Sequence, residues 1–180
     1  MNVRRKLILL ALISIAAYAV ASAAGGGTVG ENAGSVIDVR FVYNYCNDLA
    51  AMKHFYTDLL GLNEVGYNED YRYLCYQCEG FRLMFFRPDA EVDPLQGWAD
   101  QPGYQGGTTF DTSWGIRVPE AEFAGIVERL KAEGVEARYP DPEWCVDSYW
   151  GFYVKDPMGR TVEVFAMPKE RPASTTWPGE

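Results

Sequence analysis

The sequence predicts an α+β fold built from two similar βαβββ modules. In each half of the chain a β-rich apolar segment precedes a segment with helical spacing, and short strand-like segments follow. A glycine stands four positions before Met84 and another four before Glu163, and both final strands end at a proline. Since one helix cannot cover a sheet of three or four strands, we expect the halves to join as a curved sheet, or open barrel, around a shared cleft.

The first module is expected at about 36–88. Residues 36–46 are rich in β-branched and aromatic side chains and predict a strand. Asp48 is suited to cap a following helix and Gly61 to end it. The apolar residues between them recur at helical spacing: Leu49, Met52, Phe55, Tyr56, Leu59 and Leu60. Three further strands are predicted, a short one near 63–67 and two at 71–77 and 81–87.

The second module, at about 113–168, repeats this order. A strand at 113–118 precedes a helix that has Pro119 in its first turn and Gly134 at its end. The helix is expected to bury Phe123, Ile126, Val127 and Leu130. Two strands complete the module, at 149–155 and 161–166.

A long linker, 89–112, joins the modules, and a tail, 169–180, follows them. Connections of this length are usually functional or disordered. Trp98 and Tyr104 favour a linker that packs against the domain, over the cleft. The proline-containing tail is predicted to be loosely ordered.

Residues 1–23 are predicted to be a signal peptide and 24–35 a glycine-rich linker. Three basic residues precede a long apolar run, and small residues at Ala21 and Ala23 suit cleavage after Ala23. The alternative is an uncleaved membrane anchor, because the run is nearly long enough to span a bilayer. The processing site and linker favour cleavage, so we expect a periplasmic or extracellular protein.

The formal net charge of −9 argues against nucleic acid and acidic membranes as partners. No basic patch interrupts the acidity after the targeting segment, so no membrane contact is expected beyond that segment. Four cysteines, Cys46, Cys75, Cys78 and Cys145, allow three pairings in an oxidising compartment. Cys75 and Cys78 should point to opposite faces of one strand and not bond each other. Buried thiols, one long-range disulfide and a weak metal knuckle stay open.

Two pairs of segments resemble a known family. Residues 47–49 and 55–62 (NDL, FYTDLLGL) resemble the first-helix signature of the vicinal-oxygen-chelate superfamily, and 150–159 with 161–164 (WGFYVKDPMG, TVEV) resemble its closing hairpin. The superfamily includes glyoxalase-type lyases and isomerases, extradiol dioxygenases, fosfomycin-inactivating thiol transferases and metal-free proteins that sequester bleomycin. The resemblance therefore implies the fold and, in many members, a homodimer, but no single activity.

The resemblance also implies one divalent metal, held by side chains from the first and last strands of each module. The matching positions here are Phe41, Met84, Ser113 and Glu163. Phenylalanine offers no lone pair, methionine a soft thioether and serine a weak neutral donor, so only Glu163 suits a hard or borderline cation. The single histidine, His54, falls on the first helix, where we expect a surface position. We expect no metal and no cofactor.

Strand alternation predicts which side chains face the cleft. Tyr45 is placed on that face, and the predicted ligand-binding residues are Phe41, Tyr43, Arg82, Met84, Phe86, Ser113, Arg117, Glu163 and Phe165, with Trp150 and Tyr153 at its mouth. Large apolar rings with a few polar groups are typical of a small-molecule pocket, although the rings could equally fill the interior. Glu163 is the only catalytic candidate, as a general base or a cation holder. A buried ion pair with Arg82 or Arg117 is its favoured structural role.

The leading functional hypothesis is an exported protein that binds a small, aromatic or amphipathic molecule without metal. The rival hypothesis is a glyoxalase- or dioxygenase-type enzyme with an unusual site around Glu163. A third is an interaction protein whose filled cleft is a relic.

The mature chain is expected to begin near Ala24 and to lie outside the cytoplasm, because the order of basic, apolar and small residues favours export and cleavage. N-terminal sequencing of the protein from an envelope fraction measures this. An intact Met1 on soluble cytoplasmic protein would contradict it.

Overall fold

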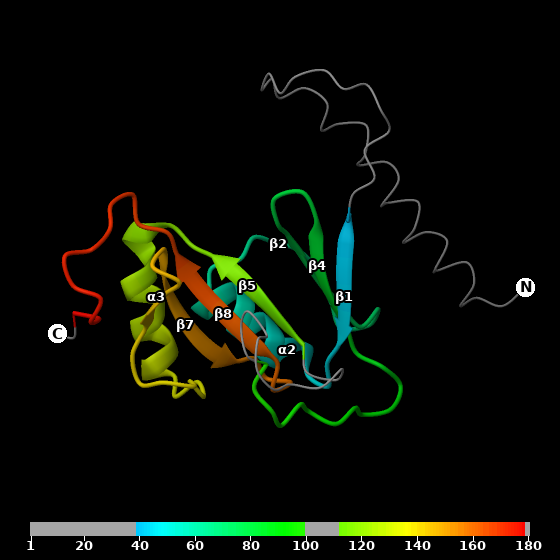
Figure 1. The fold of residues 1–180 in the computed structure, drawn as a ribbon. Coiled ribbons are helices and arrows are strands. Elements are labelled where there is room, and N and C mark those ends of the chain that lie inside the picture. The colour runs from blue at the N-terminus through cyan, green and yellow to red at the C-terminus, as the bar shows by residue number, and fades with distance from the viewer. Residues whose placement is uncertain (1–38, 100–111, 179–180) are drawn as a thin grey trace, which may run out of the picture. The chain divides into compact units, whose positions relative to one another are not determined.

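The computed structural model describes residues 39–99 and 112–178 (Figure 1). The predicted signal peptide, the glycine-rich linker and Tyr104 lie outside these residues. Within them the chain forms two four-stranded mixed sheets with one helical segment each. The predicted α+β fold of two βαβββ modules is confirmed.

The first module carries the sheet with strand order β1-β4-β3-β2. Its strands β1 and β4 are parallel, and the other pairs are antiparallel. The elements are β1 (Phe41–Tyr45), α2 (Leu49–Lys53), η2 (His54–Leu59), β2 (Glu64–Asn68), β3 (Tyr73–Gln77) and β4 (Arg82–Phe86).

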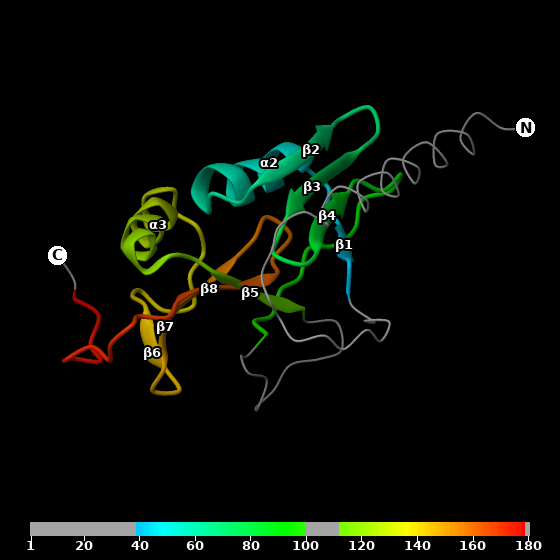
Figure 2. The ribbon, with the colours of Figure 1, turned by 90° about the horizontal axis from the view of Figure 1, so that it is seen from above.

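The second module repeats this topology, with strand order β5-β8-β7-β6. Strand β6 was not predicted, because three residues are too few to show an alternating pattern. The elements are β5 (Ser113–Arg117), α3 (Glu120–Ala132), β6 (Glu143–Cys145), β7 (Tyr149–Lys155) and β8 (Thr161–Ala166). Figure 2 shows α2 beside the first sheet and α3 beside the second.

The strand registers confirm the internal repeat. Phe41 lies opposite Arg82 in the first sheet, and Ser113 lies opposite Thr161 in the second. Met84 and Glu163 each stand two positions further along the last strand, so they occupy equivalent places in the two sheets.

The first helical segment begins and ends where the sequence predicts. The Asp48 carboxylate accepts a hydrogen bond from the backbone N–H of Ala51 (2.9 Å), and Gly61 adopts a left-handed φ of 76° beyond the last turn. Its second half is a π-helix, which the spacing of apolar residues does not reveal. This wider turn carries Tyr56, one of the side chains that connect the modules.

A buried polar cluster connects the two modules. The Asp156 carboxylate accepts hydrogen bonds from the Tyr56 hydroxyl (3.1 Å) and from the backbone N–H groups of Met158 (2.8 Å) and Arg160 (3.0 Å). The Arg160 guanidinium pairs with Asp156 (3.4 Å) and donates to the carbonyl of Tyr45 at the end of β1. Burial raises the pKa of Asp156, and Arg160 and the hydrogen-bond donors oppose that shift.

Aromatic packing joins the modules on the sides of the sheets that face the helices. Tyr56 stacks on Phe85 (centroids 4.9 Å apart), and Trp114 of β5 lies 6.1 Å from Phe85. The tail is docked rather than loose, because the Trp177 ring contacts Phe123 (5.4 Å) and Trp150 (5.0 Å). The prediction of a loosely ordered tail was wrong at this residue, since its large ring fills a space beside α3.

The linker contacts one end of the second sheet at residues 95–99. The backbone N–H of Leu95 donates to the carbonyl of Met158 (2.8 Å), and that of Ala99 to the Thr161 hydroxyl (2.8 Å). The Lys155 ammonium lies 4.9 Å from the centre of the Trp98 ring. The linker therefore packs against the end of this sheet.

All four cysteines are free thiols. No helix among the described residues is both long enough and apolar enough to cross a membrane.

Substituting Gly159 is expected to detach the linker. Gly159 has a φ of 73°, and a Cβ there would collide with the Leu95 carbonyl. Gly134 has a similar φ of 70° with open space around it, so it is a matched control. Gly134→Ala should cost about 1 kcal/mol for backbone strain, and Gly159→Ala about 2 kcal/mol more for the collision.

Denaturant unfolding measures both losses, and limited proteolysis of the linker should accelerate only in Gly159→Ala. Equal losses with an unchanged cleavage rate would show that the linker contact contributes nothing.

Candidate functional site

Each sheet has one face against its helix and one face away from it, which we call the open face. In the first sheet Leu83 and Phe85 are buried on the helix side, so the alternate residues of β4 belong to the open face. The residues of β1 and β4 that share this face are Phe41, Tyr43, Tyr45, Arg82, Met84 and Phe86. Ligand binding by these side chains stays a prediction.

Four of these residues form an exposed aromatic cluster. The Tyr43 ring lies 6.4 Å from Phe41, 6.2 Å from Tyr45 and 6.0 Å from Phe86. Phe41, Tyr43 and Tyr45 nevertheless remain 53%, 52% and 49% exposed. These rings therefore do not fill the interior, which was the alternative explanation for them.

The open face of the second sheet is more polar and more buried. The Glu163 residue is only 6% exposed, and its carboxylate accepts a hydrogen bond of 2.7 Å from the Tyr149 hydroxyl. Strand pairing places further residues from all three strands on this face. They are Ser113, Gly115 and Arg117 on β5, Gly151 and Tyr153 on β7, and Phe165 on β8. Glu163 thus points to the face predicted for it.

Gly151 allows a thiol, a carboxylate and a phenol ring to converge. A Cβ at this position would lie 3.1 Å from the Cys145 Sγ, 3.2 Å from the Glu163 Oε1 and 3.4 Å from the Tyr149 ring. The Cys145 Sγ also lies 3.6 Å from the Tyr153 hydroxyl. Sequence reasoning missed Cys145 and Tyr149, although alternation from Tyr153 along β7 would have found Tyr149.

The protonation of this cluster limits its chemistry. Burial raises the pKa of the Cys145 thiol, with Glu163 adding to the shift and the hydrogen bond from Tyr153 opposing it. Burial and the hydrogen bond to Glu163 raise the pKa of Tyr149. Since a thiol is a much weaker nucleophile than a thiolate, Cys145 is not an activated nucleophile at neutral pH.

Two expectations about this face were wrong. Within residues 39–99 and 112–178 no ion pair joins Glu163 to Arg82 or Arg117. Arg82 lies on the other sheet, where its Nε donates to Gln77 (3.3 Å), and Glu163 bonds to a phenol instead. Trp150 does not lie at the mouth of the cleft, because it pairs with Ala166 on the helix side and packs against Trp177.

The two open faces also do not form one cleft through direct contacts. Ring contacts between the modules involve Tyr56, Phe85 and Trp114, which all belong to the helix sides. In the part of the chain that the structure describes, no ring contact or hydrogen bond joins Tyr43 to Glu163. The predicted ligand-binding residues are therefore divided between two faces, one aromatic and one carrying the carboxylate.

The residues at the family's metal positions do not fit a divalent metal. Phe41 and Met84 lie on the first sheet, and Ser113 and Glu163 on the second. The Ser113 hydroxyl is buried and has no hydrogen-bond partner among the described residues, but a neutral hydroxyl beside one carboxylate is a poor ligand set. Among the described residues no group of three His, Cys, Asp or Glu side chains is placed to hold a metal ion.

His54 lies on the surface, as predicted. Its ring nitrogens contact Asp58 (3.0 Å) and Glu133 (3.2 Å), and these two carboxylates raise its pKa. It has no role at either open face.

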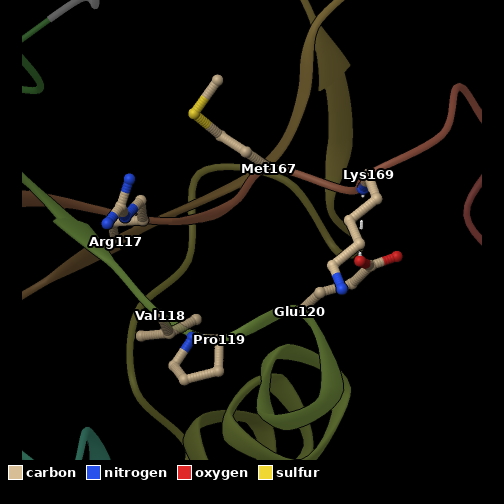
Figure 3. A pocket seen from close by; sticks show the side chains of 6 residues that line it. All are labelled: Arg117, Val118, Pro119, Glu120, Met167 and Lys169. Carbon is tan, nitrogen blue, oxygen red and sulfur yellow. Dashed lines mark hydrogen bonds between the residues drawn. The ribbon is translucent and has the colours of Figure 1, made fainter.

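A hollow of about 430 Å³ lies where β5 meets the start of α3 (Figure 3). Only Arg117 among the predicted ligand-binding residues lines it, and Glu163 does not. Its lining residues are Arg117, Val118, Pro119, Glu120, Met167 and Lys169. The hollow is therefore separate from the carboxylate.

Comparison with known proteins agrees with this architecture. A glyoxalase/dioxygenase from Nostoc punctiforme has a TM-score of 0.58 at 17% identity, over 81% of this chain and 100% of that one. A lactoylglutathione lyase from Agrobacterium tumefaciens has a TM-score of 0.50 at 22% identity, over 74% and 95%. The oxidase ChaP-H2 has a TM-score of 0.54 at 18% identity, over 73% and 94%.

Identities this low establish the fold alone, and no curated protein sequence matches the chain. The family model for the Glyoxalase/Bleomycin resistance protein/Dioxygenase superfamily, however, matches residues 41–164, well over half of the sequence. Both the repeated sheet topology and the matched segment lead to one conclusion: the chain belongs to the Glyoxalase/Bleomycin resistance protein/Dioxygenase superfamily.

Proposed function

We propose that this protein binds a small aromatic or amphipathic molecule without a metal ion. The aromatic cluster on the open face of the first sheet is the observation that carries the proposal. Rings such as Phe41 and Tyr43, which touch one another but are each about half exposed, offer stacking surface at little entropic cost. Export of the mature chain is part of the proposal, supported by the order of residues in its first segment.

An enzyme with an unusual site around Glu163 is the alternative. It draws support from the fold neighbours that carry the names of a lyase and an oxidase. The donor set at the family's metal positions disfavours it, because Phe41, Met84 and Ser113 cannot complete a metal site with Glu163. Metal-free binding requires none of these ligands.

The first expected outcome is metal-free binding that depends on the aromatic cluster. Protein dialysed against chelator should contain less than one equivalent of divalent metal and should still be stabilised thermally by members of a panel of small aromatic compounds. Tyr43→Ala should weaken the binding of these compounds about tenfold, the scale of one lost ring contact. Tyr71→Ala is the matched control, since Tyr71 is 60% exposed and lies outside the cluster.

Elemental analysis and calorimetry make these measurements. One zinc, iron, manganese or nickel ion per chain that disappears in Glu163→Gln would favour the enzyme instead. Equal losses of affinity in Tyr43→Ala and Tyr71→Ala would show that the aromatic cluster is not part of the binding site.

The second expected outcome concerns the role of Glu163 in stability. Glutamine keeps an oxygen that accepts the Tyr149 hydroxyl, and no buried arginine loses its partner. Glu163→Gln should therefore change the free energy of unfolding by no more than about 1 kcal/mol. Asp156→Asn, which weakens a buried pair with Arg160, should cost about 3 kcal/mol in the same denaturant titration. A loss near 3 kcal/mol for Glu163→Gln would make this residue part of the scaffold.

A further inference from the structure

The Glu163 carboxylate is buried beside hydrogen-bond donors that carry no charge. Its nearest donor is the neutral Tyr149 hydroxyl, at 2.7 Å, and the Tyr153 hydroxyl lies in the same cluster. Phenols satisfy the lone pairs of a carboxylate but leave its charge uncompensated. A buried negative charge of this kind attracts a cation.

Aromatic rings lie beside this carboxylate. The rings of Tyr149 and Phe165 are 5.3 Å apart and inclined by 59°. The Phe165 ring lies across β5 at Gly115, where a Cβ would be only 3.1 Å from it. An anionic oxygen close to aromatic rings is a combination that recognises organic ammonium groups, through charge and cation–π attraction together.

Two cations of this face, Lys155 and Arg117, are placed away from Glu163. Lys155 pairs with Glu136 (3.0 Å), donates to the carbonyl of Gln96 (3.0 Å) and lies over Trp98. Arg117 stands opposite Phe165 rather than Glu163 and lines the separate hollow. The overall charge of −9 further favours the approach of a cation over that of an anion.

Two other chemistries fit this cluster less well. The Cys145 thiol is protonated at neutral pH, so covalent capture of an electrophile is disfavoured. An inorganic cation would need several converging anionic or neutral oxygen or nitrogen donors, and Glu163 supplies only one carboxylate.

We propose that Glu163 binds the ammonium group of an organic cation whose apolar body lies against the rings of Tyr149 and Phe165. This inference goes beyond the proposed function: the aromatic cluster around Tyr43 lies on the first sheet, whereas Glu163 gives the second sheet a site of its own, for a cationic ligand. It also gives the carboxylate a role other than the metal ligation or proton transfer associated with its position.

Three indole probes that differ in charge test the inference: tryptamine, its neutral analogue tryptophol, and indole-3-acetate. Calorimetry with the metal-free protein should show tryptamine binding at least about tenfold more tightly than tryptophol, with indole-3-acetate weakest. Glu163→Gln should abolish this preference and leave the affinity for tryptophol unchanged. Glu128→Gln, on the exposed side of α3, removes the same formal charge and should keep the preference.

Tyr149→Phe is the second variant, since it keeps the ring and removes the hydroxyl that donates a hydrogen bond to the Glu163 carboxylate. It should preserve or increase the preference for tryptamine. Equal affinity for tryptamine and tryptophol in the wild-type protein would overturn the ammonium site while leaving the proposed function intact. A preference that survives in Glu163→Gln would also overturn it, and failure of all three probes to bind would count against both proposals.

Discussion

The buried pair of Asp156 and Arg160 is the constraint on which the arrangement of the two modules depends. It fixes the final β-turn of the second module to Tyr56 in the first helical segment and to the backbone at the end of β1. Both residues are almost completely buried, so neither charge can be left without its partner. The polar cluster therefore sets the relative position of the modules, and apolar packing around Trp114 and Phe85 fills the space beside it.

This constraint explains why the two open faces differ so much in exposure. Strand β8 follows directly from Arg160, and its alternate residues Val162 and Val164 enter the shared core. Glu163 and Phe165 are thereby turned to the open face, where the linker residues near Trp98 cover the adjoining end of the sheet. No comparable cover lies over Tyr43 among the described residues, so the aromatic rings stay accessible, whereas Glu163 on the other face is only 6% exposed.

The sequence predicts the fold well because its signals are local. The cap at Asp48, the left-handed Gly61 and the repeated spacing before Met84 and Glu163 each depend on residues close in the chain. The contacts that each side chain makes with distant segments are not local properties of the sequence. The hydrogen bond from Tyr56 to Asp156, the contact of Tyr149 with Glu163, and the burial of Trp150 each depend on packing between segments, and alternation alone could not distinguish them.

The strand order has a consequence for how the chain folds. In each sheet the last three strands form an antiparallel meander of neighbours, but the first strand reaches its place only by parallel pairing with the last. Such pairing closes a long loop before any contact compensates the lost chain entropy, so it is slow compared with hairpin formation. Strands β1 and β5 should thus dock last in their modules. The surfaces that carry Tyr43 and support Phe165 would be assembled only at the end of folding, after both meanders are in place.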